Sequence, residues 1–317
     1  MNILFVTATR IGDAVLSTGL LSYLIDRYPA ARLTIAAGPA AAPLFRGLPG
    51  LERLLVMHKR AASLHWLALY AAVAGRRWDL VVDLRGSALA WLLWAHERKT
   101  VARRDSAAHR VRELGDLFGL DPPPSPRLWL DPEALRQAAA LVPPGERLVA
   151  IGPAANWRGK QWRGERFAEL AQRLTGAGGP FPGHRVAVLA AAHERPQAEP
   201  VLHALPGGRV VDLVGRTDLL TGAAIVARAE MFIGNDTGLM HIAAAVGTPT
   251  LGLFGPSPAA RYAPWGRCTA IVQTAVSPDE MYATGFDHRT TDTLMDSLSV
   301  ERVEEAVRQL QHRAAAA

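Results

Sequence analysis

The sequence has almost no cysteine, and this scarcity excludes several kinds of site. Among its 317 residues only Cys268 is a cysteine, so no disulfide forms within the chain, and no Cys/His spacing indicates zinc. The first apolar stretch, ILFVTA at 3–8, is too short for a signal-peptide core and follows no basic segment. The longest apolar run, 87–95, is shorter than the roughly 18 residues that span a bilayer. We therefore expect a cytoplasmic protein.

Two families of nucleotide and nucleic-acid motifs are also missing. No Gly-x-Gly-x-x-Gly follows the first apolar run, which argues against a dinucleotide-dependent dehydrogenase. No helix-turn-helix, RNP, KH or zinc-finger pattern occurs either, so we expect no nucleic-acid partner.

The positive charge is concentrated in the first half of the chain. Residues 1–143 contain 18 Lys and Arg against 12 Asp and Glu, a net charge of +6, whereas residues 144–317 contain 17 of each. An Arg-rich solvated surface would explain this asymmetry, and so would an anionic partner of the first half.

Apolar runs alternate with helical patterns along the whole chain. Such alternation predicts parallel sheets with right-handed crossovers, here in two series. The expected strands are 2–8, 32–38, 51–57, 79–84 and 99–104 in the first series and 147–152, 184–190, 209–215, 230–236, 249–255 and 268–273 in the second. The fold class is thus α/β, with two doubly wound Rossmann-like domains facing across a cleft.

A Pro-rich stretch that ends at Pro143 and Pro144 separates the two series. We expect a first domain at 1–143 and a second at 144–298. Residues 299–317 then form a closing amphipathic helix with Ser299 as its N-cap.

The most informative motif is IGNDTGLMHIAAAVGTPTLGLFGPSPAARYAPWG at 233–266. A strand runs into Asp236, Thr237 and Gly238, and a helix follows, so backbone N–H groups at the helix N-terminus can hold a phosphate. His241 lies one turn further along and can donate to the same ligand. Taken singly, these residues also suit a helix cap and a core histidine.

This stretch resembles the signature of glycosyltransferase family 9, the ADP-heptose:lipopolysaccharide heptosyltransferases. Two further segments are similar to that family in the expected order: IGDAVLSTGLL at 11–21, and GPAANWRGKQWRGERFAELAQRL at 152–174. The resemblance implies a GT-B fold and an inverting transfer.

The resemblance also implies roles for particular residues. The family's N-terminal acid acts as general base, a role that maps onto Asp13, although Asp13 also suits the N-cap of a helix. Lys160 occupies the family's leaving-group lysine position, or is a surface lysine. Asn156 stands near the place where the family has small hydroxyl residues. Glu194 would contact the ribose hydroxyls.

No metal or other cofactor is expected. Many sugar-nucleotide enzymes of another fold hold a divalent cation with Asp-x-Asp, and no Asp-x-Asp occurs in this sequence. Lys160 and helix N-termini would then offset the charge of the leaving diphosphate.

The first domain is expected to bind the acceptor, an anionic glycolipid, with Gly12, Arg60, Arg85 and Arg104 as candidates. Trp91 and Trp94 lie beside basic residues, a composition that suits either a buried helix or a peripheral contact with the inner face of the inner membrane.

We therefore predict an inverting, metal-independent glycosyltransferase that moves a heptose or related sugar from an ADP-sugar to the lipopolysaccharide inner core. A GT-B sugar-nucleotide epimerase and a non-catalytic nucleotide-sugar-binding protein remain as alternatives.

Overall fold

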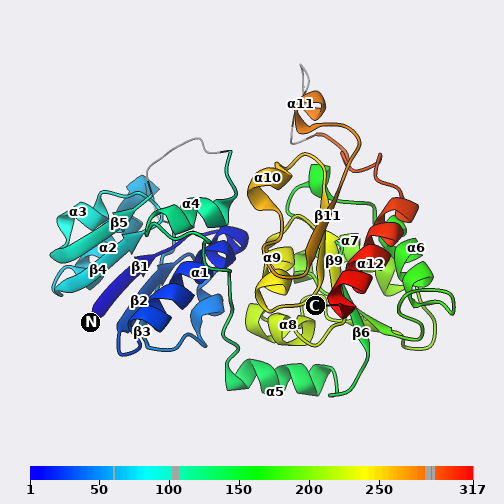
Figure 1. Cartoon of the computed structure of the whole chain (residues 1–317), viewed down its shortest axis with the longest axis horizontal. Helices are drawn as coiled ribbons and strands as arrows, with labels where there is room; N and C mark the ends of the chain where they lie inside the picture. The colour runs from blue at the N-terminus through cyan, green and yellow to red at the C-terminus, as the bar shows by residue number, and fades with distance from the viewer. Residues whose placement is uncertain (60, 102–106, 283–286, 288–289, 317) are drawn as a thin grey trace. The chain divides into compact units, whose positions relative to one another are not determined.

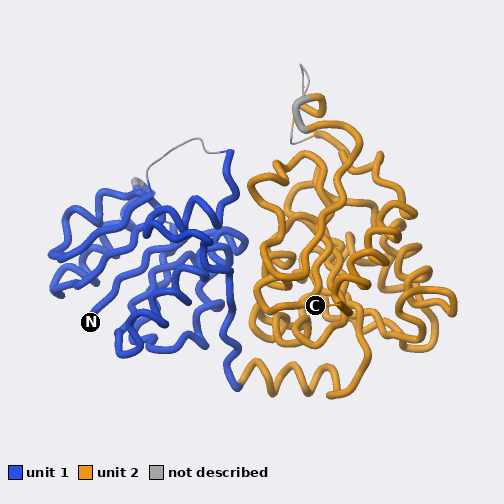
Figure 2. The backbone as a smooth tube through the Cα atoms, viewed as in Figure 1, with its two compact units in different colours: residues 1–132 blue, residues 133–317 orange. Residues whose placement is uncertain are grey.

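The chain is divided into two compact units, residues 1–132 and 133–317 (Figure 2). The computed structural model describes residues 1–59, 61–101, 107–282, 287 and 290–316. Each unit is an α/β sandwich with its own sheet (Figure 1).

The sheet of the first unit is parallel throughout, and its strand order in the described residues is β3-β2-β1-β4-β5. The strands are β1 (Asn2–Val6), β2 (Arg32–Ala37), β3 (Leu51–Val56), β4 (Trp78–Asp83) and β5 (Ala95–Thr100). The helices are α1 (Ile11–Arg27), α2 (Leu64–Val73), α3 (Leu89–Leu92) and α4 (Arg110–Asp116), with short 3-10 turns η1 (Ala42–Phe45) and η2 (Ala61–Ser63). Parallel strands need crossover connections, and the helices supply most of them.

The second unit repeats this topology with a sixth strand, in the order β11-β10-β9-β6-β7-β8. Its strands are β6 (Leu148–Gly152), β7 (Arg185–Val188), β8 (Val210–Asp212), β9 (Met231–Asn235), β10 (Thr250–Phe254) and β11 (Thr269–Gln273). The helices are α5 (Pro132–Leu141), α6 (Gly164–Thr175), α7 (Arg195–Leu202), α8 (Leu219–Val226), α9 (Gly238–Ala245), α10 (Ala259–Tyr262), α11 (Pro278–Met281) and α12 (Val300–Ala315). The turns η3 (Arg158–Lys160) and η4 (Ala192–Glu194) follow β6 and β7.

Both sheets reverse their strand order at one point, between β1 and β4 in the first unit and between β6 and β9 in the second. In open parallel sheets ligands bind at such a switch point, beyond the carboxyl ends of the strands. The prediction of two doubly wound Rossmann-like domains is confirmed, and the topology identifies four strand-end loops as the places to look for a site.

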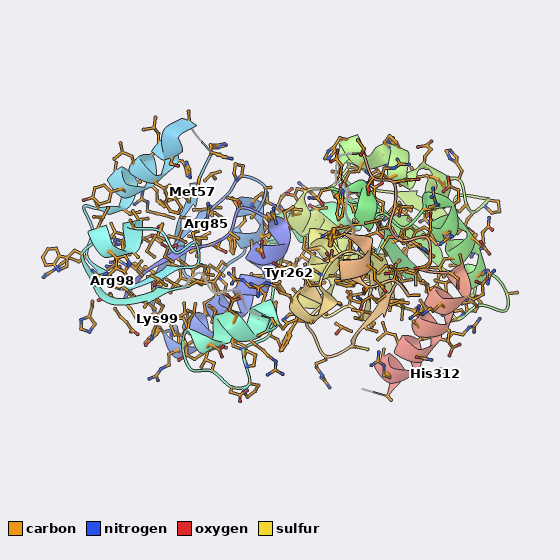
Figure 3. All side chains as sticks on the ribbon, turned by 90° about the horizontal axis from the view of Figure 1, so that it is seen from above. Met57, Arg85, Arg98, Lys99, Tyr262 and His312 are labelled. Carbon is orange, nitrogen blue, oxygen red and sulfur yellow. The ribbon has the colours of Figure 1, made fainter. Side chains whose placement is uncertain are left out.

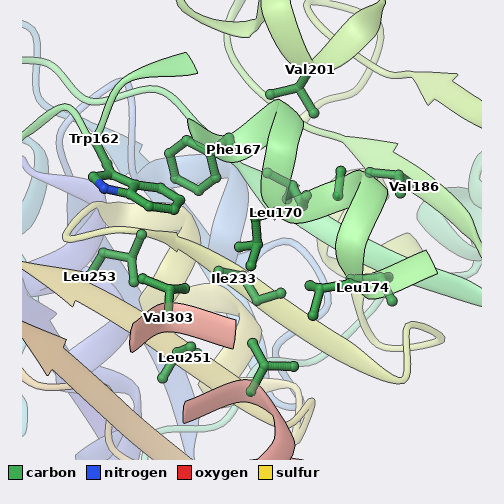
Figure 4. Packing of buried hydrophobic residues seen from close by; sticks show 14 of the residues in the cluster. Trp162, Phe167, Leu170, Leu174, Val186, Val201, Ile233, Leu251, Leu253 and Val303 are labelled. Atoms are coloured by element: carbon green, nitrogen blue, oxygen red, sulfur yellow. The ribbon is translucent and has the colours of Figure 1, made fainter. Parts of the chain in front are cut away.

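The core of the second unit shows why its helices form where they do. Helix α6 places Phe167, Leu170 and Leu174 on one face, at the spacing of a helical stripe, and all three are fully buried against strands β6, β7 and β9 (Figure 4). Helix α12 adds Val303 and Val307 to the same cluster. Its N-cap is Ser299, whose hydroxyl accepts a hydrogen bond from the Arg302 N–H, as predicted.

Two expectations need correction. The last strand of the first unit, β5, runs over 95–100 and not 99–104, because its polar sequence AHERKT forms a half-exposed edge strand that lacks an apolar run. The division between the units falls after Pro132, before the expected boundary at 143. Helix α5 stands on the side of the second unit because Gln137 accepts a hydrogen bond from Thr221 and Arg228 donates to the Val142 carbonyl.

Helix α1 packs tightly against residues 124–127, which follow α4 in the chain. A side chain at Gly19 would place its Cβ 2.2 Å from the carbonyl oxygen of Pro124, so only glycine fits there. The Thr18 hydroxyl accepts a hydrogen bond from the Arg127 N–H in the same contact. Among the described residues, no helix is both long enough and apolar enough to cross a membrane.

Candidate active site

The loops that follow β6 and β9 meet at the switch point of the second unit. Lys160, at the end of η3, donates a hydrogen bond from its Nζ to Oδ2 of Asp236, at 2.7 Å. The Asp236 side chain is 8% exposed and the Lys160 side chain 27%. The sequence assigned both residues to donor binding, and the structure shows that they form one ion pair at the edge where a ligand would bind.

Asn235, the last residue of β9, ties these two loops together. Its side chain is fully buried, accepts a hydrogen bond from the Trp162 N–H at 3.1 Å and donates one to the Pro153 carbonyl at 2.8 Å. Both partners lie in the segment that carries Lys160. A single amide therefore fixes the position of that segment relative to Asp236.

The N-terminus of α9 lies beside this ion pair and is a candidate anion site. Thr237 is its N-cap residue in extended conformation, and its hydroxyl makes no capping hydrogen bond. The first N–H groups of a helix have no partner within the helix, and the helix dipole favours negative charge there. Gly238 begins the helix beside Asp236, and His241 is buried one turn further on.

The turn of Lys160 is also supported from the C-terminal side, by residues 290–298. The Leu294 N–H donates to the Gly159 carbonyl, and the Thr293 hydroxyl donates to the Gln161 carbonyl. Asp296 of this segment accepts hydrogen bonds from the guanidinium of Arg163, which lies just after the Lys160 turn. These hydrogen bonds lower the pKa of Asp296 and raise that of Arg163.

An ion pair of Arg158 with Asp292, at 2.7 Å, lowers the pKa of Asp292 mainly through its hydrogen bond. Both carboxylates are therefore charged at neutral pH, and their ion pairs hold residues 290–298 against the Lys160 turn. We call residues 290–298 the strap.

The other predicted donor-binding residues lie at neighbouring strand ends. Asn156 is exposed in the loop after β6. Glu194 closes η4 after β7, and its Oε2 already accepts a hydrogen bond from the Ala191 N–H. In place of the hydroxyl residues that the family has before its lysine, the Ala155 N–H donates to the side chain of Gln197, on α7.

Two aromatic rings form one rim of these loops. Trp157 and Tyr282 have nearly parallel rings, with centroids 6.5 Å apart and an interplanar angle of 11°. The Tyr282 hydroxyl donates to the Pro256 carbonyl in the turn after β10, and burial raises the pKa of Tyr282. The rim thus joins two of the strand-end turns.

In the first unit, Gly12 and Asp13 lie in the first turn of α1, directly beyond the carboxyl end of β1. Asp13 is half-buried, and within the described residues no hydrogen bond or ion pair engages its carboxylate. Its N-cap neighbour is Arg10, which makes no side-chain cap, so Asp13 is not the cap residue. An unpaired carboxylate at a switch point can accept a proton from a ligand.

The strand on the other side of this switch point, β4, ends in Asp83. Its buried carboxylate accepts hydrogen bonds from the N–H groups of Arg85 and Ser87 and from the Ser87 hydroxyl, which shapes the turn after β4. This turn presents Arg85, whose guanidinium lies over the ring of Trp66. The predicted acceptor contacts Arg60 and Arg104 lie outside the described residues, and Trp91 and Trp94 are exposed.

Sequence reasoning missed the residues that support the site. Asn235 stands inside the quoted motif, but a buried bridging amide has the same sequence appearance as a loop asparagine. Gln197 and the strap at 290–298 lie far from the motifs along the chain. The only sequence signal for the strap was its aspartates, and their Arg partners are remote in sequence.

The fold is a pair of doubly wound units, and the candidate site of the second unit lies at strand ends beside a helix N-terminus, where enzymes of this architecture bind their ligands. A family model described as glycosyltransferase family 9 (heptosyltransferase) matches residues 87–284, more than half of the chain. The chain belongs to this family and is a glycosyltransferase.

Curated relatives agree with this family. Lipooligosaccharide heptosyltransferase 2 of Haemophilus influenzae is 26% identical over 297 residues, which cover 81% of this chain and 84% of the relative. Lipopolysaccharide heptosyltransferase 2 of Salmonella typhimurium is 24% identical, over 81% and 83% of the two chains.

Two solved structures have the same fold. Escherichia coli ADP-heptose LPS heptosyltransferase II aligns with a TM-score of 0.78 at 19% identity, over 99% of each chain. The E. coli heptosyltransferase WaaC with ADP aligns with a TM-score of 0.72 at 17% identity, over 98% of this chain and 100% of that one. These alignments support the predicted GT-B fold class.

Proposed function

We propose that this enzyme transfers a heptose, or a closely related sugar, from an ADP-sugar to the inner core of lipopolysaccharide. The donor proposal draws on the family and on the similar solved structure, the E. coli heptosyltransferase WaaC with ADP. The acceptor proposal draws on relatives named lipopolysaccharide and lipooligosaccharide heptosyltransferases. The proposed place of action is the cytoplasmic face of the inner membrane, where a lipid-borne acceptor meets a nucleotide-sugar.

In this proposal the second unit holds the donor diphosphate. The observation that carries it is the Lys160–Asp236 pair beside the N-terminus of α9, where Thr237 makes no side-chain cap, because a cation and the positive end of a helix then lie at one strand-end edge. A diphosphate placed there would share Lys160 with Asp236 and accept hydrogen bonds from the first turn of α9. Asn156, Glu194 and His241 are proposed to contact the rest of the donor.

The reaction we propose is a single inverting displacement. An acceptor hydroxyl oxygen attacks the anomeric carbon, and the bond from that carbon to the diphosphate oxygen breaks. The electron pair of this bond stays on the diphosphate, where Lys160 and the α9 N–H groups stabilise the added charge. Asp13 takes the hydroxyl proton as general base. No metal is assigned a part.

The first unit is proposed to hold the acceptor, with Gly12 keeping the approach to Asp13 open. Arg85 is a contact for acidic groups on the acceptor, as are Arg60 and Arg104 on sequence grounds. The net charge of +6 on residues 1–143 favours an anionic glycolipid.

The test is ADP release from ADP-heptose with Kdo-lipid A as acceptor, for wild type and Asp13→Asn. We expect release that depends on the acceptor and persists in EDTA, and a fall in kcat of about 10²- to 10⁴-fold in the variant. The affinity for ADP alone should not change, because Asp13 lies in the other unit. UDP-, GDP- and dTDP-sugars should not turn over.

A matched control is Asp26→Asn, which removes an exposed carboxylate from the far end of the same helix. It should retain wild-type kcat. Undiminished turnover in Asp13→Asn would refute the base assignment, and turnover with UDP-sugars would refute the donor assignment. Donor binding without transfer to any lipid acceptor would leave a binding protein as the better description.

A further inference from the structure

The rings of Trp157 and Tyr282 lie beside the Lys160 turn, and no step of the proposed transfer uses them. Trp157 is half-buried, and Tyr282 is 45% exposed. The two rings are nearly parallel, with an interplanar angle of 11°. Two partly exposed rings with the same orientation form a flat apolar surface, which we call the Trp157 platform.

Both rings are held in place by contacts within the second unit. A Cβ at Gly159 would lie 2.6 Å from the Cζ2 atom of Trp157, so this glycine lets the indole lie against the Lys160 turn. The Lys160 N–H donates to the Trp157 carbonyl at 3.0 Å. The Tyr282 hydroxyl donates to the Pro256 carbonyl at 2.9 Å, which ties the phenol ring to the turn after β10. A platform that is already ordered loses little conformational freedom when a ligand binds.

A third aromatic side chain follows this turn in the chain, but its face is already covered. Tyr262 is the last residue of α10 and is labelled in Figure 3. The guanidinium of Arg261 lies over its ring, 5.6 Å from the centroid. We therefore do not include Tyr262 in the platform.

The strand order places the platform at one end of the proposed donor site. The neighbouring strands β7, β6, β9 and β10 are followed by turns that carry, in this order, Glu194, Lys160, Asp236 and Pro256. Glu194 is proposed to contact the ribose, and Lys160 the diphosphate. An ADP-sugar has its ribose, diphosphate and sugar in the same order. Its sugar then falls on the side of β10, where Tyr282 is anchored.

We propose that the Trp157 platform binds the transferred sugar of the donor and contributes to its selection. The C–H bonds on one face of a sugar ring are slightly positive and the face of an aromatic ring is negative, so the two attract each other. Asn156, exposed beside Trp157, has an amide that can hydrogen-bond the sugar hydroxyls. This inference rests on the proposed function, because it assigns residues to the sugar end of the same donor.

Position decides between the sugar and the adenine ring, which also stacks on aromatic side chains. Adenine is attached to the ribose, so it lies on the side of β7 when Glu194 contacts the ribose. Strands β7 and β10 are three strand spacings apart, about 14 Å. A platform that is tied to the turn after β10 therefore suits the sugar and not the base.

The test is calorimetric titration with ADP and with ADP-heptose, without acceptor, for wild type, Trp157→Ala and Tyr282→Ala. We expect each variant to bind ADP-heptose about three- to tenfold more weakly, because one stacked ring is lost. The affinity for ADP should change by less than about twofold, since ADP lacks the transferred sugar. Trp157→Phe, which keeps an aromatic ring, should retain most of the wild-type affinity for ADP-heptose.

Trp94→Ala is the matched control, since it removes a tryptophan that is 63% exposed in the other unit. It should bind both ligands like wild type, and circular dichroism should show that all variants are folded. The ratio of the two affinities separates a sugar contact from a structural role. A substitution of Trp157 that only loosened the Lys160 turn would weaken ADP and ADP-heptose alike.

An equal loss of affinity for ADP and ADP-heptose would therefore overturn the inference. A raised KM for the acceptor with unchanged donor binding would also overturn it and would assign the platform to the acceptor. Variants that bind both ligands like wild type would refute the platform while the proposed donor stands. Wild type that binds neither ligand would refute the donor assignment itself, and the inference with it.

Discussion

Asn235→Leu should disorder the donor site, although Asn235 is not proposed to contact the donor. The substitution replaces the buried amide by an apolar side chain of similar volume. It leaves the Trp162 N–H and the Pro153 carbonyl without the hydrogen bonds that Asn235 gives them. Trp162 lies two residues after Lys160, so we expect the Lys160 turn to move away from Asp236.

The cost can be worked out from those two groups. A buried polar group that loses its partner costs about 1–3 kcal/mol, so the pair predicts a loss of about 2–6 kcal/mol in the stability of the second unit. That loss is a large share of the free energy of unfolding of a typical domain, which is about 5–15 kcal/mol. The affinity for ADP should fall as well, because the ion pair that prepares the site is no longer held in place.

The assay is denaturant unfolding followed by circular dichroism, with ADP binding by calorimetry and the exchange rate of the Trp162 amide by mass spectrometry. Thr34→Val is the control: its hydroxyl is buried in β2 and has no hydrogen-bond partner among the described residues, so removing it should be neutral or stabilising. If Asn235→Leu proves as stable as Thr34→Val and binds ADP normally, the bridging role is refuted.

Three further predictions concern other contacts. Gly19→Ala should lower the thermal stability by about 2 kcal/mol or more, since its Cβ would lie 2.2 Å from the Pro124 carbonyl oxygen; a variant with unchanged Tm would contradict this. Lys160→Met should weaken ADP binding about ten- to hundredfold in calorimetry, and an unaltered Kd would remove it from the donor site. Asp296→Asn tests the strap: Arg163 lowers the folded-state pKa of Asp296, so this pair stabilises above the unfolded pKa and is lost as the pH falls through the folded value. The wild-type advantage, about 1 kcal/mol or less for a pair this exposed, should close below about pH 4 in Tm measurements, and an advantage that grows in acid would reverse the sign we assign.

Much of the architecture could be predicted from local patterns. The apolar runs at 2–8 and 147–152 form β1 and β6, and the amphipathic pattern at 164–174 forms α6. Such elements can be predicted because a buried strand requires a continuous apolar run and a helix with one buried face requires apolar residues at helical spacing. The edge strand β5 was misplaced for the opposite reason, since a half-exposed strand carries no apolar run.

The residues proposed for chemistry could also be predicted from the sequence, because Gly, Asp and Thr between an expected strand and an expected helix indicate a strand-end turn. What those residues touch was not. The sequence by itself determined the order of strands and helices and the turns that carry Asp13, Lys160 and Asp236. Only the tertiary structure decided that Lys160 pairs with Asp236 and that Asn235 bridges their loops, because these contacts join segments more than seventy residues apart.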